Sequence, residues 1–379
     1  MAIEAGADSS GDRRLEINAM RAALALARRG LGAVWPNPSV GCVIVNDGRV
    51  VGRGWTQPGG RPHGETEALR RAGEAARGAI AHVSLEPCCH WGQTPPCVDA
   101  LIAAGVRRVV VALEDPDPRV AGEGLRRLRA AGLDVEVGLC AEEAAEVNAG
   151  FLSRLRLGRP LVTFKLATSL DGRIAVATGE SQWITGPPAR DRAHALRASH
   201  DAIMVGTGTV VADDPQLTCR LPGLGHRSPV RVVIDRHLRI SPASRIIADA
   251  PRVPTWVLTL RSADPGRRAM FLANRVTLID VDDDGEGQID LAAALGALGE
   301  RGITRLLVEG GARLAAAFFR ARLIDRLVWV HAPLVIGGDG IPAIAGFDLA
   351  ALADGRAFER LSTETIGDDV LTTFRVRPI

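Results

Sequence analysis

The chain has 379 residues, well above the roughly 150 residues of a typical single domain, so we expect at least two domains. Hydrophobic residues make up 46% and charged residues 24%, which is ordinary globular usage and excludes a disordered protein. The net charge of +2 is too small to indicate a nucleic-acid surface. No apolar run reaches the ~20 residues of a membrane helix and the N-terminus lacks the apolar core of a signal peptide, so we expect a cytoplasmic protein without nucleic-acid or membrane partners.

The first part of the chain alternates helical and strand patterns. Apolar residues at helical spacing end at Gly30, and Asn46-Asp47-Gly48 separates two apolar runs as in a β-hairpin. The expected helices are 14–30, 65–73, 97–104, 124–131 and 141–157, and the expected strands are 40–45, 49–55, 82–85, 106–113 and 135–139. This alternation predicts an α/β domain built in layers.

A second alternating series begins after Gly158-Arg159-Pro160, which has the composition of a boundary. Its expected strands are 161–167, 202–205, 230–235, 255–260, 276–280, 305–308 and 327–335, and its expected helices are 188–198, 291–301 and 311–321. The sequence therefore predicts a disordered N-terminus at 1–13, a first domain at 14–150, a linker at 151–160 and a second domain at 161–379.

The cysteines divide into scattered and clustered ones. Because the chain lacks a signal peptide, its six cysteines argue against a disulfide framework. Cys42, Cys140 and Cys219 have apolar or small neighbours and are expected to be buried small residues. Cys88, Cys89 and Cys97 lie close together and need a different explanation.

A histidine and two of the clustered cysteines have the chemistry of a zinc site. His63, Cys88 and Cys97 supply one imidazole and two thiolates, a net-neutral set that leaves the fourth tetrahedral position open for water, as in a catalytic site. Pro95-Pro96 places Cys97 in the first turn of its helix, where backbone N–H groups favour a thiolate. Glu65 lies two residues after His63, close enough to exchange a proton with that water and a leaving amine.

These residues resemble the signature of zinc-dependent deaminases, although eight residues rather than two separate the cysteines. Cys89 is a poor alternative ligand, because adjacent side chains cannot easily both reach one ion. The longer spacing is typical of one family. The segments that carry this resemblance are His63-Gly64-Glu65, Glu86-Pro87-Cys88-Cys89-His90-Trp91-Gly92-Gln93-Thr94-Pro95-Pro96-Cys97 and Pro36-Asn37-Pro38-Ser39-Val40-Gly41-Cys42-Val43-Ile44-Val45.

Together these segments resemble the bifunctional riboflavin-biosynthesis deaminase/reductases. The resemblance implies an N-terminal cytidine-deaminase-like three-layer domain that hydrolyses the 2-amino group of 2,5-diamino-6-ribosylamino-4(3H)-pyrimidinone 5′-phosphate. By the same resemblance Zn²⁺ is the cofactor, Glu65 is catalytic and Asn37 holds the substrate. The family usually has other residues at four positions: Ala for Gly64, His for Thr56, a basic residue for Gln93 and Ser for Cys89.

The second domain contains two glycine-rich turns between a strand and a helix. Gly206-Thr207-Gly208-Thr209 lacks the third glycine of a dinucleotide fingerprint, so alone it is equally compatible with a plain turn. Glu309-Gly310-Gly311 precedes a second helix and leaves backbone N–H groups available for a pyrophosphate. Two such turns in one domain favour nucleotide binding.

This half also resembles the same family, in the segments 164–172, 181–185 and 209–218 and the turn at Gly311. The resemblance implies a C-terminal α/β domain similar to dihydrofolate reductase, which uses NADPH to reduce the ribosyl group of 5-amino-6-(5-phosphoribosylamino)uracil to ribityl. The implied NADPH contacts are Ala167, Trp183, Thr209, Asp213 and Gly311. The implied contacts to the phosphorylated ribosylaminopyrimidine are Ser181, Arg197, Leu217, Arg220 and Glu309. We expect Lys165, within the segment 164–172, to contact this substrate as well.

Physical chemistry is compatible with these roles. Arg197 and Arg220 can clamp a phosphate and Ser181 can add a hydroxyl donor. Either Lys165 or Asp213 could relay the proton that reaches the sugar oxygen, and the sequence does not choose between them. Lys165 is the only lysine among 46 basic residues. A codon bias towards arginine explains why lysine is scarce, but it does not explain why this lysine is retained.

Two other functions stay open at this point. A nucleoside or nucleic-acid deaminase fused to an unrelated reductase is disfavoured for polynucleotides, because the first 150 residues are slightly acidic. A structural zinc module would explain Thr56 and Gln93, but it has no need of Glu65. The sequence also leaves a homo-oligomer open.

Overall fold

A computed structural model describes residues 9–377 and their side chains from residue 13 on. The chain forms two compact units, and the boundary between them in the sequence falls between Arg156 and Leu157. Within the described part, no helix is both long and apolar enough to cross a bilayer.

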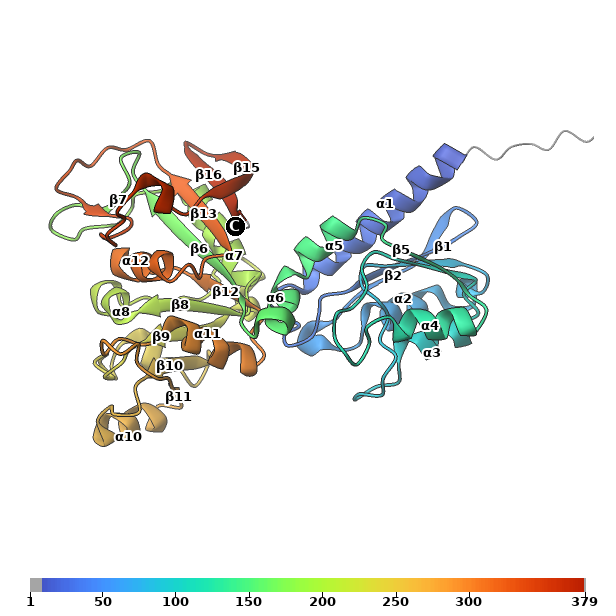
Figure 1. The fold of residues 1–379 in the computed structure, drawn as a ribbon, viewed down its shortest axis with the longest axis horizontal. Coiled ribbons are helices and arrows are strands. Elements are labelled where there is room, and N and C mark those ends of the chain that lie inside the picture. The colour runs from blue at the N-terminus through green and yellow to red at the C-terminus, as the bar shows by residue number, and fades with distance from the viewer. Residues whose placement is uncertain (1–8, 378–379) are drawn as a thin grey trace, which may run out of the picture. The chain divides into compact units, whose positions relative to one another are not determined.

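The first unit contains a five-stranded sheet in the order β2-β1-β3-β4-β5 (Figure 1). The hairpin of β1 and β2 is antiparallel, β1 pairs antiparallel with β3, and β3, β4 and β5 run parallel. The strands are β1 (Gly41–Asn46), β2 (Arg49–Trp55), β3 (Ile80–Val83), β4 (Arg108–Val111) and β5 (Asp134–Val137). Each of these strands overlaps a strand predicted from the sequence.

Helices cover both faces of this sheet. Along β1, Cys42 and Ile44 pack in a core with α2, α3, α4 and α6, whereas Val43 packs on the opposite face with α1 and α5. The helices are α1 (Ser9–Ala27), α2 (Gly64–Ala72), α3 (Cys97–Ala103), α4 (Glu123–Ala130), α5 (Ala141–Val147) and α6 (Ala149–Leu157), with 3₁₀ turns at Arg28–Gly30, Pro58–Gly60 and Gly73–Ala76. The unit is therefore the three-layer domain that the sequence predicts.

Glycines in the sheet allow helix α2 to approach it closely. A Cβ atom at Gly54 on β2 would lie 2.1 Å from the backbone oxygen of Gly64, the first residue of α2. Only glycine permits that approach. It fixes the start of α2, and with it His63 and Glu65, against the sheet.

The second unit contains a nine-stranded sheet in the order β11-β10-β9-β8-β12-β6-β13-β16-β15. The strands from β11 to β13 in this order run parallel, and β16 and β15 close the edge antiparallel. Its strands are β6 (Leu161–Thr168), β8 (Ala202–Gly206), β9 (Val230–Ile234), β10 (Thr255–Thr259), β11 (Thr277–Asp280), β12 (Arg305–Val308), β13 (Arg326–His331), β15 (Phe358–Ile366) and β16 (Asp369–Val376), while β7 (Arg173–Ala175) and β14 (Ile341–Pro342) form a separate pair. Because the strands from β11 to β13 are parallel, the loops after them gather at one edge of the sheet.

The parallel strands of this unit are continuous apolar runs buried against helices, as is typical of parallel sheets. Val205 on β8 and Val233 on β9 share a core with Val210 of α8 and Phe271 of α10. The helices are α7 (Pro187–Ala198), α8 (Thr207–Asp213), α9 (Arg245–Ala248), α10 (Pro265–Ala273), α11 (Leu291–Glu300) and α12 (Ala312–Arg320), with 3₁₀ turns at Gly225–Arg227 and Leu352–Asp354.

The structure differs from the sequence expectation at the ends of the first unit. Helix α1 begins at Ser9, so residues 9–13 are helical, while residues 1–8 lie outside the described part. Most of the expected linker at 151–160 belongs to α6, which ends at Leu157. The single helix expected at 141–157 is two helices, because Asn148 leaves helical geometry and its buried side chain accepts a hydrogen bond from the backbone N–H of Ser39.

Candidate functional site

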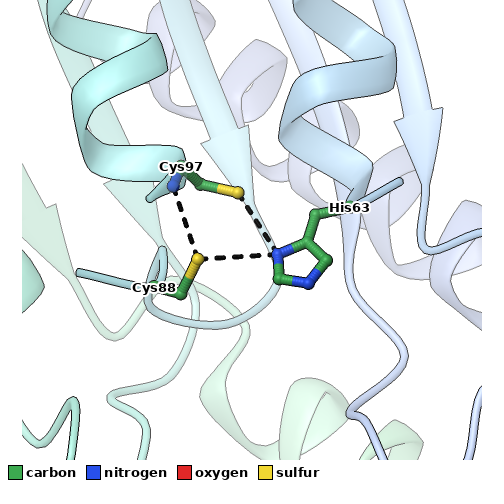
Figure 2. Close-up of side chains that lie close together, drawn as sticks. All are labelled: His63, Cys88 and Cys97. Carbon is green, nitrogen blue, oxygen red and sulfur yellow. Dashed lines mark hydrogen bonds between the residues drawn. The ribbon is translucent and has the colours of Figure 1, made fainter. Parts of the chain in front are cut away.

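Three side chains from separate elements converge in the first unit (Figure 2). His63 precedes the first residue of α2, Cys88 lies in the segment after β3, and Cys97 is the first residue of α3. The Nδ1 atom of His63 lies 3.5 Å from the Sγ of Cys88 and 3.3 Å from the Sγ of Cys97. All three ligand atoms lie within 4.8 Å of one another.

This arrangement fits a zinc ion. Zinc–sulfur bonds of about 2.3 Å and zinc–nitrogen bonds of about 2.0 Å at tetrahedral angles separate ligand atoms by roughly 3.5 Å. The distances from Nδ1 to the two sulfur atoms, 3.5 and 3.3 Å, agree with that separation. The three side chains are half-buried or buried, which limits the competition of water for them.

Glu65 lies beside this group in the first turn of α2. The residue is 2% exposed, and its Oε2 atom has no hydrogen-bond partner among the described residues. Burial raises the pKa of Glu65 to about 7, with the His63 charge acting in the opposite direction. A buried carboxyl group whose pKa lies near neutrality can both accept and return a proton.

The first residue of α3, Cys97, forms hydrogen bonds with Cys88. The backbone N–H of Cys97 donates to the Sγ of Cys88 over 3.4 Å. The hydrogen bond with the Cys97 side chain, followed by that with His63 and by this backbone N–H, lowers the pKa of the Cys88 thiol to about 4, against the effect of burial. The sequence led us to expect this effect of the helix start on Cys97, whereas the structure directs its first N–H at Cys88.

Cys89 points to a different partner. Its thiol donates to the backbone oxygen of Arg119 over 3.6 Å, and Cys89 is not part of the ligand group of the described residues. The guanidinium of Arg127 donates to the backbone oxygen of Cys89. Cys89 therefore anchors the loop that carries Cys88.

Thr56 has a structural partner that the sequence did not reveal. It is 2% exposed, and its Oγ1 accepts a hydrogen bond from the backbone N–H of Val40 over 2.9 Å and lies 3.3 Å from the backbone oxygen of Pro38. It thus fixes the segment that carries Asn37, which is half-buried and packs over Gly60. Gln93 is exposed in the loop before α3.

In the second unit, Arg197 and Glu309 form a largely buried ion pair, with side chains 13% and 12% exposed. The Nε and Nη2 atoms of Arg197, on α7, each donate to one oxygen of Glu309 over 2.9 Å, and Nη1 donates to the backbone oxygen of Thr218 over 3.2 Å. Burial alone would raise the pKa of Glu309, but Arg197 and then Lys165 lower it to about 2. A phosphate clamp by Arg197, expected from the sequence, requires this pair to open.

Lys165 lies next to this pair. It is on β6, whose neighbour β12 ends directly before Glu309. Burial lowers the pKa of Lys165, and the charge of Glu309 acts in the opposite direction. The structure therefore brings Lys165, Arg197 and Glu309 together. When Lys165 is protonated, its ammonium group lies beside the carboxylate of Glu309.

His194 is a neighbour that the sequence analysis missed. Its Nδ1 lies 3.2 Å from the backbone oxygen of Thr218 and accepts from the backbone N–H of Arg220 over 3.3 Å. Burial, and then the charge of Arg197, lowers the pKa of His194. Its position three residues before Arg197 on α7 was an available signal, since residues at that spacing share one helix face.

The residues expected to contact NADPH come from helix α8, the turn before α12 and connecting segments. Thr209 on α8 and Gly311 before α12 are neighbours, because a Cβ at Gly311 would lie 3.9 Å from the Oγ1 of Thr209. Burial raises the pKa of Asp213 at the end of α8. Trp183 is 64% exposed and stacks against the guanidinium of Arg190 at 4.4 Å from the ring centroid.

The remaining expected residues lie at the end of a strand or in connecting segments. Ala167 is near the end of β6, and Ser181 lies between β7 and α7. Leu217 is 3% exposed with a positive φ of 56°, a conformation that leucine rarely adopts. The buried guanidinium of Arg231 donates to the backbone oxygen of the preceding Gln216 over 3.3 Å, which helps to hold Leu217 in that conformation.

Comparisons with known proteins cover both units. The cytidine and deoxycytidylate deaminase zinc-binding region matches residues 14–113, and the RibD C-terminal domain matches residues 160–372. The chain is 45% identical over 364 residues to the riboflavin biosynthesis protein RibD of Escherichia coli strain K12, covering 93% of this chain and 96% of that protein. It is 40% identical over 355 residues to the protein of the same name from Bacillus amyloliquefaciens, covering 93% and 94% of the two chains.

Solved structures agree over nearly the full length. Form 1 of Acinetobacter baumannii RibD has a TM-score of 0.87 and 37% identity, covering 97% of this chain and 100% of that chain. A diaminohydroxyphosphoribosylaminopyrimidine deaminase/5-amino-6-(5-phosphoribosylamino)uracil reductase from Thermotoga maritima has a TM-score of 0.84 and 33% identity, with the same coverage. These matches confirm the expected fold class, a cytidine-deaminase-like domain followed by a domain similar to dihydrofolate reductase. The chain belongs to the RibD family of bifunctional riboflavin-biosynthesis enzymes, which join a zinc-dependent deaminase to an NADPH-dependent reductase.

Proposed function

We propose that the first unit deaminates 2,5-diamino-6-ribosylamino-4(3H)-pyrimidinone 5′-phosphate and that the second reduces 5-amino-6-(5-phosphoribosylamino)uracil to its ribityl form. The observation that carries the first step is the buried, unpartnered Oε2 of Glu65 beside the His63, Cys88 and Cys97 group. A structural zinc site gains nothing from a buried carboxyl oxygen without a hydrogen-bond partner, because such an atom costs stability.

The residues of the first unit have separate tasks in this proposal. His63, Cys88 and Cys97 hold the zinc ion, which activates water for attack on the pyrimidine when it is bound. Glu65 takes a proton from the attacking water and returns it to the leaving amine, for which a pKa of about 7 is suitable. Asn37 binds the substrate from the segment that Thr56 fixes in place.

The second unit reduces the ribosyl group of the substrate in this proposal. NADPH, when bound, donates a hydride to the substrate. Ala167, Trp183, Thr209, Asp213 and Gly311 bind this cofactor in our proposal. Ser181, Arg220 and Leu217 contact the phosphorylated substrate. The charged side chains of Lys165, Glu309 and Arg197 lie together at the same site.

The domain boundaries and the cellular location are also part of this proposal. We assign the deaminase to residues 14–150 and the reductase to residues 161–379. All six cysteines are free thiols, which fits the reducing cytoplasm in which we expect the enzyme to act.

A coupled assay tests the two activities on one preparation. Purified protein with quantified zinc is given the diaminopyrimidine phosphate, and ammonia release and NADPH oxidation are followed separately. We expect ammonia first and NADPH oxidation only after deamination. Cytidine and RNA are supplied as competing substrates, and ammonia release from cytidine alone would overturn the proposed substrate. Bound zinc without ammonia release from any of the three would favour a structural zinc module.

A further inference from the structure

A half-buried arginine of the first unit lies near the metal group and has no carboxylate partner. Arg61 is two residues before the ligand His63, and its Nη1 atom donates to the hydroxyl oxygen of Thr94 over 2.5 Å. Among the described residues, Arg61 forms no ion pair with a carboxylate. A half-buried guanidinium whose charge is not neutralised by the protein favours an anionic ligand.

The loop against which this guanidinium lies leads to a metal ligand. Thr94 is three residues before Cys97, and three residues of chain span at most about 11 Å. A Cβ atom at Gly92 would lie 2.9 Å from the Nη2 atom of Arg61, so the guanidinium lies close to the backbone of Gly92. Arg61 therefore lies against the loop at both neighbours of Gln93.

The charge of Arg61 also acts on the metal group. The hydrogen bond with Cys88 raises the pKa of His63, whereas burial and then the positive charge of Arg61 act in the opposite direction. Arg61 directly follows Gly60, and a Cβ atom at Gly60 would lie 1.9 Å from the Nδ2 atom of Asn37. Arg61 is therefore near both the metal group and the residue that we expect to hold the substrate.

The shape of the proposed substrate indicates which of its groups Arg61 binds. The carbon atom that loses its amino group must lie at the metal group beside Glu65, and the ribosyl group separates the pyrimidine from the 5′-phosphate. The phosphate must therefore be bound by side chains from the surrounding loops. The bond to Thr94 uses one of the five N–H groups of Arg61, so two others can bind a phosphate in bidentate fashion.

We propose that Arg61 binds the 5′-phosphate of the diaminopyrimidine substrate and takes the place of the basic side chain that the family usually has at position 93. The inference rests on the proposed deaminase activity and adds a residue that selects the phosphorylated substrate. Gln93 cannot supply a cation. The guanidinium of Arg61 does so from the opposite side of the same loop, because it lies against Gly92 and Thr94.

Ammonia release from the substrate with and without its phosphate tests this contact. In wild type, removal of the phosphate should raise KM at least tenfold, because losing one charge-assisted hydrogen bond weakens binding by about that factor. Arg61→Gln should raise KM for the phosphorylated substrate at least tenfold and leave KM for the dephosphorylated substrate and both kcat values close to those of wild type. The two losses should therefore not add, as expected for groups in contact.

Moving the cation to position 93 tests whether Arg61 replaces a basic side chain there. Arg61→Gln/Gln93→Arg should recover most of the affinity that Arg61→Gln loses for the phosphorylated substrate. It should not change KM for the dephosphorylated substrate. Arg53→Gln removes an exposed arginine from β2 of the same unit and should match wild type with both substrates.

Further variants separate phosphate binding from support of the loop. Thr94→Ala removes the hydrogen bond to Arg61 but keeps the cation, so KM for the phosphorylated substrate should stay within about threefold of wild type. Arg61→Lys keeps the charge without the bidentate geometry and should lose less affinity than Arg61→Gln. Zinc content and NADPH oxidation of the deaminated substrate should be unchanged in every variant.

Four outcomes would overturn the inference. The first is an equal rise of KM for both substrates in Arg61→Gln, and the second is no rise for either. The third is a Thr94→Ala variant that reproduces the loss, which would make Arg61 a support of the loop. The fourth is no recovery in Arg61→Gln/Gln93→Arg. If zinc-loaded wild type releases no ammonia from the diaminopyrimidine phosphate, the proposed deaminase function itself fails, which distinguishes the two failures.

Discussion

Arg197 and Glu309 join α7 to the end of β12 through two parallel hydrogen bonds of 2.9 Å each. Because Arg197 also donates to the backbone oxygen of Thr218, its guanidinium is engaged on three nitrogen atoms. This geometry makes Arg197 a positioning residue that keeps Glu309 charged and oriented. Arg220, whose backbone N–H contacts His194, is then the better candidate for the substrate phosphate.

Breaking this pair should change how stability depends on pH. In the wild type, the pKa of Glu309 is about 2 in the folded chain and about 4.5 in the unfolded chain, so the pair stabilises fully above the unfolded value and is lost as pH falls toward 2. In Arg197→Gln the chief opposing charge is gone, and burial raises the folded pKa of Glu309. We therefore expect a loss of about 3–5 kcal/mol at pH 8 and a smaller loss at pH 5.

Thermal and urea unfolding of both proteins at pH 5, 6.5 and 8 measures this dependence. Arg252→Gln, which removes an exposed arginine, should follow the wild type at every pH. A loss in Arg197→Gln that is independent of pH would show that Glu309 stays ionised without Arg197.

Replacing the only lysine by arginine should damage the reductase although it conserves charge. Lys165 lies on the buried strand β6 next to Glu309 and Arg197, and a guanidinium there is larger and cannot release its proton. Overpacking displaces neighbouring side chains and costs about 1–3 kcal/mol of stability. Because Glu309 and Arg197 are among those neighbours, we expect kcat/KM of NADPH oxidation to fall at least about tenfold, with ammonia release unchanged. Arg252→Lys tests the reverse exchange on the surface and should be neutral, whereas a fully active Lys165→Arg would remove the special role of this lysine.

The placement of His63 and Cys97 could be predicted because local sequence positions both residues. His63 comes directly before a helix and Cys97 directly after two prolines, so both positions follow from helix starts. The pair of Arg197 and Glu309 could not be predicted, because its partners are 112 residues apart and meet only through helix α7 and the β12 strand.

Some elements that the sequence analysis missed lack the usual patterns, whereas α10 was missed although Asp264 caps it and Pro265 begins it. Strand β15 is largely exposed along its length, so it has no buried face to produce an alternation of apolar residues. Residues 207–209, expected in a glycine-rich turn, form the first turn of helix α8, and the Thr207 hydroxyl donates to the backbone oxygen of Ile234 at the end of β9. Thr56 was interpreted from a family difference alone, and its contacts with the backbone became visible only in the structure.

Thr56 should support the deaminase by fixing a loop. In Thr56→Val, the buried N–H of Val40 loses its acceptor, which costs about 1–3 kcal/mol and loosens the segment that carries Asn37. We expect a higher KM for the diaminopyrimidine with unchanged zinc content and unchanged reductase activity. Thr56→Ser retains the hydroxyl and should restore the KM, whereas an equal effect of both substitutions would contradict a role of the hydrogen bond.

Glu65→Gln should separate proton transfer from metal binding. Glutamine has nearly the same size and can occupy the same buried position, but it cannot exchange a proton at neutral pH. The three ligand atoms, which lie within 4.8 Å of one another, are unchanged by this substitution. We therefore expect zinc to remain bound at one ion per chain while ammonia release falls by at least about a hundredfold.

The same variant shows whether the two active units work independently. When it is supplied with the deaminated substrate, Glu65→Gln should oxidise NADPH at the wild-type rate, because the reductase residues belong to the other compact unit. Removing zinc from wild type with a chelator should likewise stop only ammonia release, and added zinc should restore it. A loss of both activities in Glu65→Gln, with zinc still bound, would mean that reduction depends on the state of the deaminase site.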